Sequence, residues 1–396
     1  MKKKILSDMF INIIATSVPT LILQLIILPF LTGYMSDERY GLLVTILSLM
    51  NVIPATFGNV LNNIRLLNRE DDETNTKIAN YNILLLILTG INLLIVMLFS
   101  LFYDKQITMI SISLNILVSI FWLMKEYYIV TFRLKIDYFA IMVCNFVMII
   151  GYLVGLFFFL ITGYWQLIYL LGYFLSLIYI FFKGDLWKEP FVISSEFKSL
   201  SFQTFLLISA SFLSRVMTYA DKLLIFPILG GVITSIYYAA TLSGKIVSLA
   251  MTPLSSVILT YLSKTKGKND QQFKLAFISG VVACIGGYII CVLCTRPVLT
   301  LIYPQFVNEA MKYILITTGT TALQALISVI NPFVMKFFDL KWQIAINGGT
   351  ALSYVVLCVG LLSVFGLYGF CIGALLTNVF KIIFMLFIYY RVKQKQ

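Results

Sequence analysis

The chain has 396 residues, of which 60% are apolar and 15% aromatic, and its mean hydropathy is +0.95. Only 12% of the residues are charged, about half of the roughly 25% that soluble domains carry. Histidine is absent, which excludes Ser-His-Asp catalysis, His-zinc sites and histidine pH switches. We therefore expect a polytopic membrane protein with no metal and no cofactor.

Apolar runs of the length that a helix needs to cross about 30 Å of hydrocarbon recur along the whole chain. They predict twelve spans, at about 10–33, 41–63, 81–103, 108–124, 138–162, 164–182, 201–229, 235–260, 274–295, 309–335, 344–364 and 370–390. The predicted fold class is therefore an all-α polytopic membrane protein. Because the connections are short, no extramembrane domain is expected to hold an active site.

The net charge of +12 is explained by topology. If the N-terminus is cytoplasmic, most Lys and Arg residues fall in cytoplasmic connections, and the other side holds only Arg39, Lys105, Arg296 and Lys312. The positive-inside rule then places both termini in the cytoplasm. The positive charge requires no nucleic acid as a partner.

The longest cytoplasmic connection, at about 183–200, lies close to the midpoint of the chain. It predicts an N-terminal six-helix bundle over 1–190 and a C-terminal six-helix bundle over 191–396.

A shift of half the chain length aligns similar turns in the two halves. PFLTGYMSDERYG, at 29–41, then overlies PILGGVITSIYYA, at 227–239, so that Tyr40 meets Tyr238. Two copies of an even number of spans would insert with the same orientation and be related by an axis along the membrane normal. The alternative is chance similarity between two helix-loop-helix turns.

Five charged residues lie well inside predicted spans: Arg215, Asp221, Lys222, Lys245 and Lys381. A charge at the bilayer centre costs at least about 2.5–3.5 kcal/mol, so such residues normally face a cavity or a partner. Asp221 is the one deep carboxylate, and we interpret it as either a coupling group or a counter-ion. An ion pair between Asp221 and Lys245 fits the matched depths of the two residues.

The seventh span carries a polar stripe, because Arg215, Tyr219 and Lys222 fall within about 60° of one another on a helix. The eighth span repeats this pattern with Tyr238 and Lys245. Spans ten and twelve add polar side chains at helical spacing, which extend the candidate cavity lining to Gln324, Asn331 and Lys381. Hydroxyls and amides on membrane helices often only bond to neighbouring helices, and this alternative stays open for each of them.

Arg65 and Arg133, at the cytoplasmic ends of the second and fourth spans, are candidates to attract a phosphate where the substrate is admitted. The alternative is that they serve topology alone. Lys125 and Glu126 are boundary residues to which the sequence assigns no role.

The layout and two stretches, YMSDERYGLL at 34–43 and YADKLLIFPILGGVITSIYYAATLSGKIVSLAMTPLSSV at 219–257, resemble the Wzx-like lipid-linked oligosaccharide (polysaccharide) flippases of the MATE-like MOP exporter superfamily. The resemblance implies two pseudo-symmetric six-helix bundles that transport by alternating access. It implies a bacterial cytoplasmic (inner) membrane protein that flips a polyprenyl-diphosphate-linked oligosaccharide, of the undecaprenyl-diphosphate type, for capsule, O-antigen or related cell-surface polysaccharide assembly. Membrane lipids, an H⁺ or Na⁺ coupling ion and polysaccharide polymerase machinery are the partners that it implies.

Two other functions remain open. A multidrug or cation antiporter of the same fold would be expected to carry intramembrane carboxylates, whereas the five intramembrane charges here are mostly cationic. A membrane polysaccharide polymerase or glycosyltransferase would place catalytic groups on a sizeable external loop, which this chain lacks. We therefore expect a transporter and no enzyme.

Overall fold

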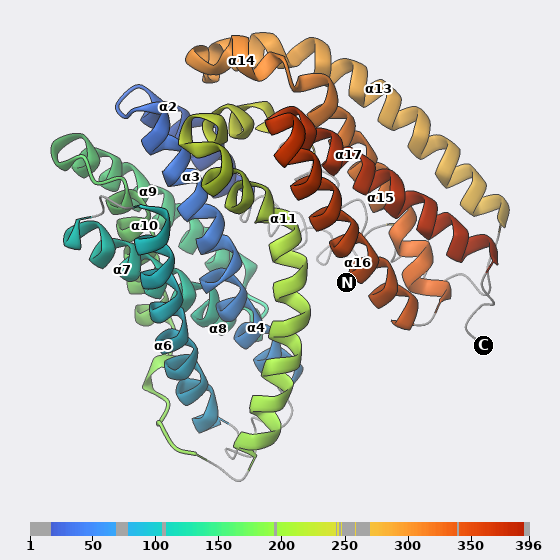
Figure 1. Cartoon of the computed structure of the whole chain (residues 1–396). Helices are drawn as coiled ribbons and strands as arrows, with labels where there is room; N and C mark the ends of the chain where they lie inside the picture. The colour runs from blue at the N-terminus through green and yellow to red at the C-terminus, as the bar shows by residue number, and fades with distance from the viewer. Residues whose placement is uncertain are drawn as a thin grey trace. The chain divides into compact units, whose positions relative to one another are not determined.

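The computed structural model describes residues 17–68, 78–104, 108–193, 196–242, 244, 247, 258, 270–338 and 340–391. Within these residues every regular element of secondary structure is a helix (Figure 1). Nine helical stretches of this described part are long and apolar enough to cross a membrane, and Ser17–Thr32 and Phe197–Leu213 are two shorter apolar helical stretches. The predicted all-helical, polytopic fold class is confirmed.

The chain forms two compact units, which do not follow chain order strictly. Unit 1 takes the described residues up to Tyr34 together with Leu42–Leu223. Unit 2 takes Met35–Gly41 and the described residues from Leu224 onward.

Two long helices contribute to both units: α3 (Asp37–Val52) and α11 (Phe197–Ala240). The other helices of unit 1 are η1 (Leu23–Ile27), α2 (Leu28–Thr32), α4 (Pro54–Leu67), α6 (Ile78–Tyr103), α7 (Met109–Tyr128), α8 (Val130–Leu134), α9 (Tyr138–Thr162), α10 (Gln166–Lys183) and η2 (Leu186–Lys188). Those of unit 2 are α13 (Asp270–Ile302), η3 (Pro304–Phe306), α14 (Val307–Met311), α15 (Ile314–Phe337), α16 (Leu340–Tyr354), η4 (Val355–Val359) and α17 (Gly360–Arg391).

Glycines with left-handed backbone mark where long apolar stretches bend. Gly230, at φ 83°, divides α11 where the sequence predicts a short connection between the seventh and eighth spans. Gly366, at φ 59°, divides α17 in the same way between the eleventh and twelfth spans. A side chain with a Cβ rarely adopts such angles, so glycine permits these bends. Most of the eighth predicted span beyond Leu242 lies outside the described residues.

In unit 1, α9 and α10 approach closely because glycines line their contact. A Cβ added at Gly151 would lie 2.5 Å from the carbonyl oxygen of Leu171, and one added at Gly155 would lie 2.5 Å from that of Leu167. Small residues let membrane helices pack backbone to backbone. The resulting van der Waals contacts stabilise the helix pair, because the hydrophobic effect does not drive helices together in lipid.

In unit 2, the start of α3 packs against the part of α11 that follows Gly230. Ser235 Oγ donates a hydrogen bond to the carbonyl oxygen of Asp37 at 2.6 Å. The rings of Tyr40 and Tyr238 meet edge to face, with centroids 5.9 Å apart. Both pairs are separated by the half-chain shift that aligns the predicted repeats. The two aligned turns therefore contact each other, and the duplication itself stays a prediction.

The close packing of α9 on α10 predicts that Gly155→Ala destabilises the protein by about 1–3 kcal/mol, the cost of overfilling a packed contact. Gly90→Ala on α6 is the matched control, because a Cβ added at Gly90 meets nothing within 4 Å. Thermal unfolding of the purified protein in detergent measures both. Equal unfolding temperatures for the two variants would contradict the close approach of α9 and α10.

Candidate functional site

The cationic stripe predicted on the seventh span lies on the part of α11 that belongs to unit 1. Arg215 and Tyr219 are half-buried, and Lys222 is 6% exposed. Tyr219 Oη donates a hydrogen bond to Asn51 Oδ1 of α3 at 3.2 Å. This part of α11 is therefore seated on α3 by a polar contact.

Arg215 lies far from both ends of its helical segment. It follows Phe197 by 18 residues and precedes Gly230 by 15, which corresponds to about 27 Å and about 22 Å of helix. Among the residues that the structure describes, no carboxylate forms an ion pair with Arg215. A guanidinium at this depth without a carboxylate beside it needs water or an anionic ligand.

Lys222 and Asp221 form an ion pair with each other. Lys222 Nζ contacts Asp221 Oδ2, and the two side chains are 7% and 14% exposed. Asp221 Oδ1 also accepts a hydrogen bond from the Lys222 backbone at 2.9 Å. Asp221 therefore contacts the neighbouring Lys222, and Lys245, its predicted counter-ion, lies outside the described residues.

The other predicted lining residues lie in unit 2 and in different surroundings. Lys381, on α17, is half-buried and has no ion-pair partner in the described part of the chain. Gln324, on α15, is exposed. Asn331 Oδ1 accepts a hydrogen bond from Gln343 Nε2 of α16 at 3.0 Å. Tyr238 is 6% exposed among the rings of the α3 contact described above.

The hydroxyls on α15 bond mainly to their own helix. Thr320 donates to the carbonyl oxygen of Ile316 at 2.9 Å, and Ser328 donates to that of Gln324 at 3.0 Å. These contacts satisfy hydroxyl groups on a membrane helix without any ligand. The hydroxyl stripe of the tenth span is explained by local bonding.

Arg65 sits at the centre of a buried cluster in unit 1. Its Nη1 lies 2.8 Å from Glu189 Oε2, and its Nη2 contacts Oε1, so the carboxylate is held by both prongs of the guanidinium. The same Nη1 donates to Tyr127 Oη at 2.9 Å, and the ring of Tyr81 lies 4.9 Å from Arg65 Cζ. The Arg65 side chain is only 3% exposed. Arg65 thus joins α4, α6, α7 and the linker that follows α10.

Arg133 is the more accessible of the two arginines predicted near the cytoplasmic mouth. Its side chain is exposed, and its Nη1 donates to Asn62 Oδ1 at 2.6 Å and to Asn63 Oδ1 at 3.2 Å. Because its hydrogen-bond acceptors are neutral amides, the exposed Arg133 guanidinium retains the capacity to bind an anion.

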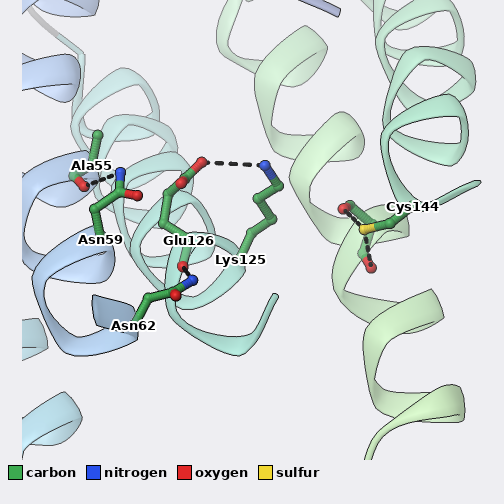
Figure 2. Close-up of polar contacts among 7 residues, drawn as sticks. Ala55, Asn59, Asn62, Lys125, Glu126 and Cys144 are labelled. Atoms are coloured by element: carbon green, nitrogen blue, oxygen red, sulfur yellow. Dashed lines mark hydrogen bonds and ion pairs between the residues drawn. The ribbon is translucent and has the colours of Figure 1, made fainter. Parts of the chain in front are cut away.

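A second buried ion pair involves Lys125 and Glu126, near the end of α7. Lys125 Nζ lies 3.2 Å from Glu126 Oε1, with the two side chains 9% and 21% exposed. The Glu126 carbonyl oxygen accepts a hydrogen bond from Asn62 Nδ2 at 2.9 Å, and Asn59 Nδ2 bonds to Ala55 one turn away (Figure 2). The sequence assigned no role to Lys125 and Glu126. Their adjacency in an aromatic run was the one available signal.

The charges therefore divide into two kinds. Arg65, Lys125 and Lys222 are cations whose charge a neighbouring carboxylate compensates. Arg215 and Lys381 are half-buried cations that have no carboxylate among the described residues. Chemically, the second kind can neutralise an anion, and a guanidinium can hold two oxygens of one phosphate.

The buried position of Arg65 predicts that Arg65→Ala lowers the free energy of unfolding by about 3–5 kcal/mol, because the Glu189 carboxylate loses its partner while still buried. Glu189→Gln in the Arg65→Ala background should recover part of this loss. A double-mutant cycle of unfolding in detergent gives the coupling between the two residues. Independent, additive effects would contradict a structural ion pair.

No protein-family model matches the sequence, and no curated protein matches it. Solved structures are similar in fold. One is an inward-facing multidrug resistance MATE family transporter of the MOP superfamily, with a TM-score of 0.68, 13% identity, and coverage of 95% of this chain and 97% of that chain. Another is the lipid II flippase MurJ in an inward closed conformation, with a TM-score of 0.71, 11% identity, and coverage of 96% and 86%.

A third similar structure is a MOP superfamily transporter from Pyrococcus furiosus, described by the reverse polarity of its binding pocket, with a TM-score of 0.52, 14% identity, and coverage of 97% and 93%. Identities this low establish the fold alone. The chain has the fold that MATE transporters and the flippase MurJ share within the MOP superfamily.

Proposed function

We propose that this protein flips a polyprenyl-diphosphate-linked oligosaccharide from the cytoplasmic to the outer leaflet, for assembly of a capsule, O-antigen or related polysaccharide. The headgroup would pass through a cationic cavity by alternating access while the polyprenyl tail stays in lipid. The observation that carries this proposal is Arg215, a half-buried guanidinium within the long apolar helix α11 with no ion-pair partner among the described residues.

A diphosphate needs such cations because it loses hydration as it enters the membrane. Charge-assisted hydrogen bonds replace part of that hydration, and they are stronger than neutral ones. Arg215 and Lys381 supply positive charge that is not already compensated. We infer that they form the cationic wall of the substrate cavity, and that Lys245 joins them.

Tyr219, Lys222, Tyr238, Gln324 and Asn331 complete the proposed lining. Tyr219 and Lys222 share the Arg215 face of α11, and their contacts with Asn51 and Asp221 would hold that face in position. We assign Asp221 to the counter-ion role, because its carboxylate forms an ion pair with Lys222. Arg133 is the better candidate for first contact with phosphate, since Arg65 is enclosed by Glu189.

A multidrug or cation antiporter is the second candidate, and fold similarity to a multidrug MATE transporter over nearly the full length of both chains favours it. Cationic drugs would be matched by intramembrane carboxylates that lack a partner. Asp221, on α11, and Glu126, near the end of α7, are both paired with lysines. The balance of uncompensated charge therefore favours an anionic substrate. An enzyme is the least supported candidate, because the similar structures are transporters.

Arg215 variants test this proposal. Arg215→Gln should reduce leaflet transfer of an undecaprenyl-diphosphate-linked sugar about ten- to a hundredfold, which corresponds to one charge-assisted contact of about 1.5–3 kcal/mol. Arg215→Lys should retain part of the activity, because it keeps the charge and loses only the planar fork. The measurement is protection of the labelled sugar from an external glycosidase, with protein reconstituted in liposomes.

Lys198→Gln is the matched control, since it removes the same charge from the exposed start of the same helix. It should leave transfer unchanged. Full activity of Arg215→Gln, or transport of a cationic drug that is unaffected by this variant, would contradict a cationic site for a diphosphate.

A further inference from the structure

Apolar side chains are exposed in a connection of unit 1. They do not lie on a spanning helix, so contact with the hydrocarbon around such a helix does not explain their exposure. The linker after α10 carries Trp187, Phe191, Val192 and Ile193, whose exposures lie between 45% and 66%. Residues 189–193 have no helical structure. Exposed apolar groups on a membrane helix face lipid, but Trp187 lies in the three-residue helix η2 and the other three lie on irregular backbone, all beyond the end of α10.

A second connection lies beside this linker. A Cβ added at Gly184 would lie 2.6 Å from Thr131 Cγ2 of α8. The hydrogen bond from Lys188 holds the pKa of Asp185 below its usual range, and Lys135, just after α8, acts in the same direction. Ile136, next to Lys135, is 60% exposed. The two connections thus form one surface.

We call this the linker surface and define it by its exposed apolar and basic members: Lys135, Ile136, Lys183, Trp187, Lys188, Phe191, Val192 and Ile193. Its lysines are exposed. Asp185 pairs with Lys188 at 2.6 Å and Glu189 is taken up by Arg65. Neither carboxylate forms an ion pair with Lys135 or Lys183, so the exposed lysines give the linker surface a net positive charge.

The linker surface is held in shape by contacts with the bundle. Trp187 Nε1 donates to the carbonyl oxygens of Phe181 and Gly184, both at 3.1 Å. The Glu189 carbonyl oxygen accepts from Asn82 Nδ2 of α6 at 2.8 Å, and its carboxylate is fixed by Arg65. The indole and the neighbouring lysines are therefore presented in a defined arrangement.

The membrane interface is the environment that fits this combination. Irregular backbone cannot enter hydrocarbon, because its N–H and C=O groups would lack hydrogen-bond partners. The apolar side chains beside it favour removal from water. Tryptophan concentrates at the level of the lipid headgroups, where one edge of the ring is dry and the other wet. Lysines at that level attract anionic headgroups.

We propose that the linker surface lies in the headgroup layer and binds anionic bilayer lipid. The distribution of basic residues predicts that this is the cytoplasmic leaflet. The inference does not depend on the transported substrate, since it rests on unit 1 alone.

Quenching of Trp187 by brominated lipid tests this inference. Trp187 is left as the single tryptophan by replacing Trp122, Trp165 and Trp342 with Phe, and the protein is reconstituted in phosphatidylcholine vesicles. Phosphatidylglycerol with brominated acyl chains should quench Trp187 about twofold more than brominated phosphatidylcholine at the same mole fraction, and the preference should fall with added salt. Lys135→Gln with Lys183→Gln should remove the preference while quenching by brominated phosphatidylcholine persists.

A variant that keeps Trp165 alone is the control, because Trp165 precedes α10 at its opposite end. It should show no preference for the anionic lipid. Equal quenching of Trp187 by the two lipids would overturn the anionic-lipid assignment. Absence of quenching by either lipid, with full access of acrylamide to Trp187, would place the surface in water and overturn the inference altogether.

Discussion

The cost of a charge inside a membrane is the constraint on which the structure depends. A charge on a membrane helix must be paired, hydrated or bound to a ligand. Unit 1 meets this requirement for Arg65, Lys125 and Lys222 through Glu189, Glu126 and Asp221. Each pair also ties segments together or fixes a helix face. Paired charges of this kind hold the helices in position. Removing one partner lowers the free energy of unfolding by more than the intact pair contributes to it.

The same constraint indicates that the cations without a carboxylate partner bind a ligand or water. Arg215 and Lys381 are half-buried on helices long enough to span a membrane, and no carboxylate in the described part of the chain pairs with either. Their charge is available to a ligand. An anion that crosses the membrane with little water is the ligand that such residues suit best, which is why we favour a lipid diphosphate over a cationic drug.

Sequence reasoning predicted the local structure well where local chemistry decides it. The bounds expected for the fifth span match α9, because Asp137 caps its start through a hydrogen bond from the backbone N–H of Ala140 and Gly163 ends it in a left-handed conformation. The bend at Gly230 was expected as a connection, since a glycine pair between apolar runs does not distinguish a kinked helix from a loop. The Arg65–Glu189 pair joins residues 124 positions apart, and no periodicity predicts such a contact. The assignment of residues to the cavity stays a prediction for the same reason, because which side chains line a cavity depends on how helices far apart in the sequence pack together.

Access of water to the Arg215 face of α11 is the decisive test of a cationic, water-filled cavity. In a cysteine-free variant of the active protein, Thr218→Cys places a thiol one turn from Arg215 while keeping every charge. Leu206→Cys and Leu213→Cys place thiols on the opposite face, about 160–180° round the helix, where the leucines are exposed. The account predicts that a water-soluble, membrane-impermeant maleimide labels Thr218→Cys and not the two leucine positions. Equal protection of all three would mean that Arg215 is enclosed in packed protein, and would contradict a cationic, water-filled cavity.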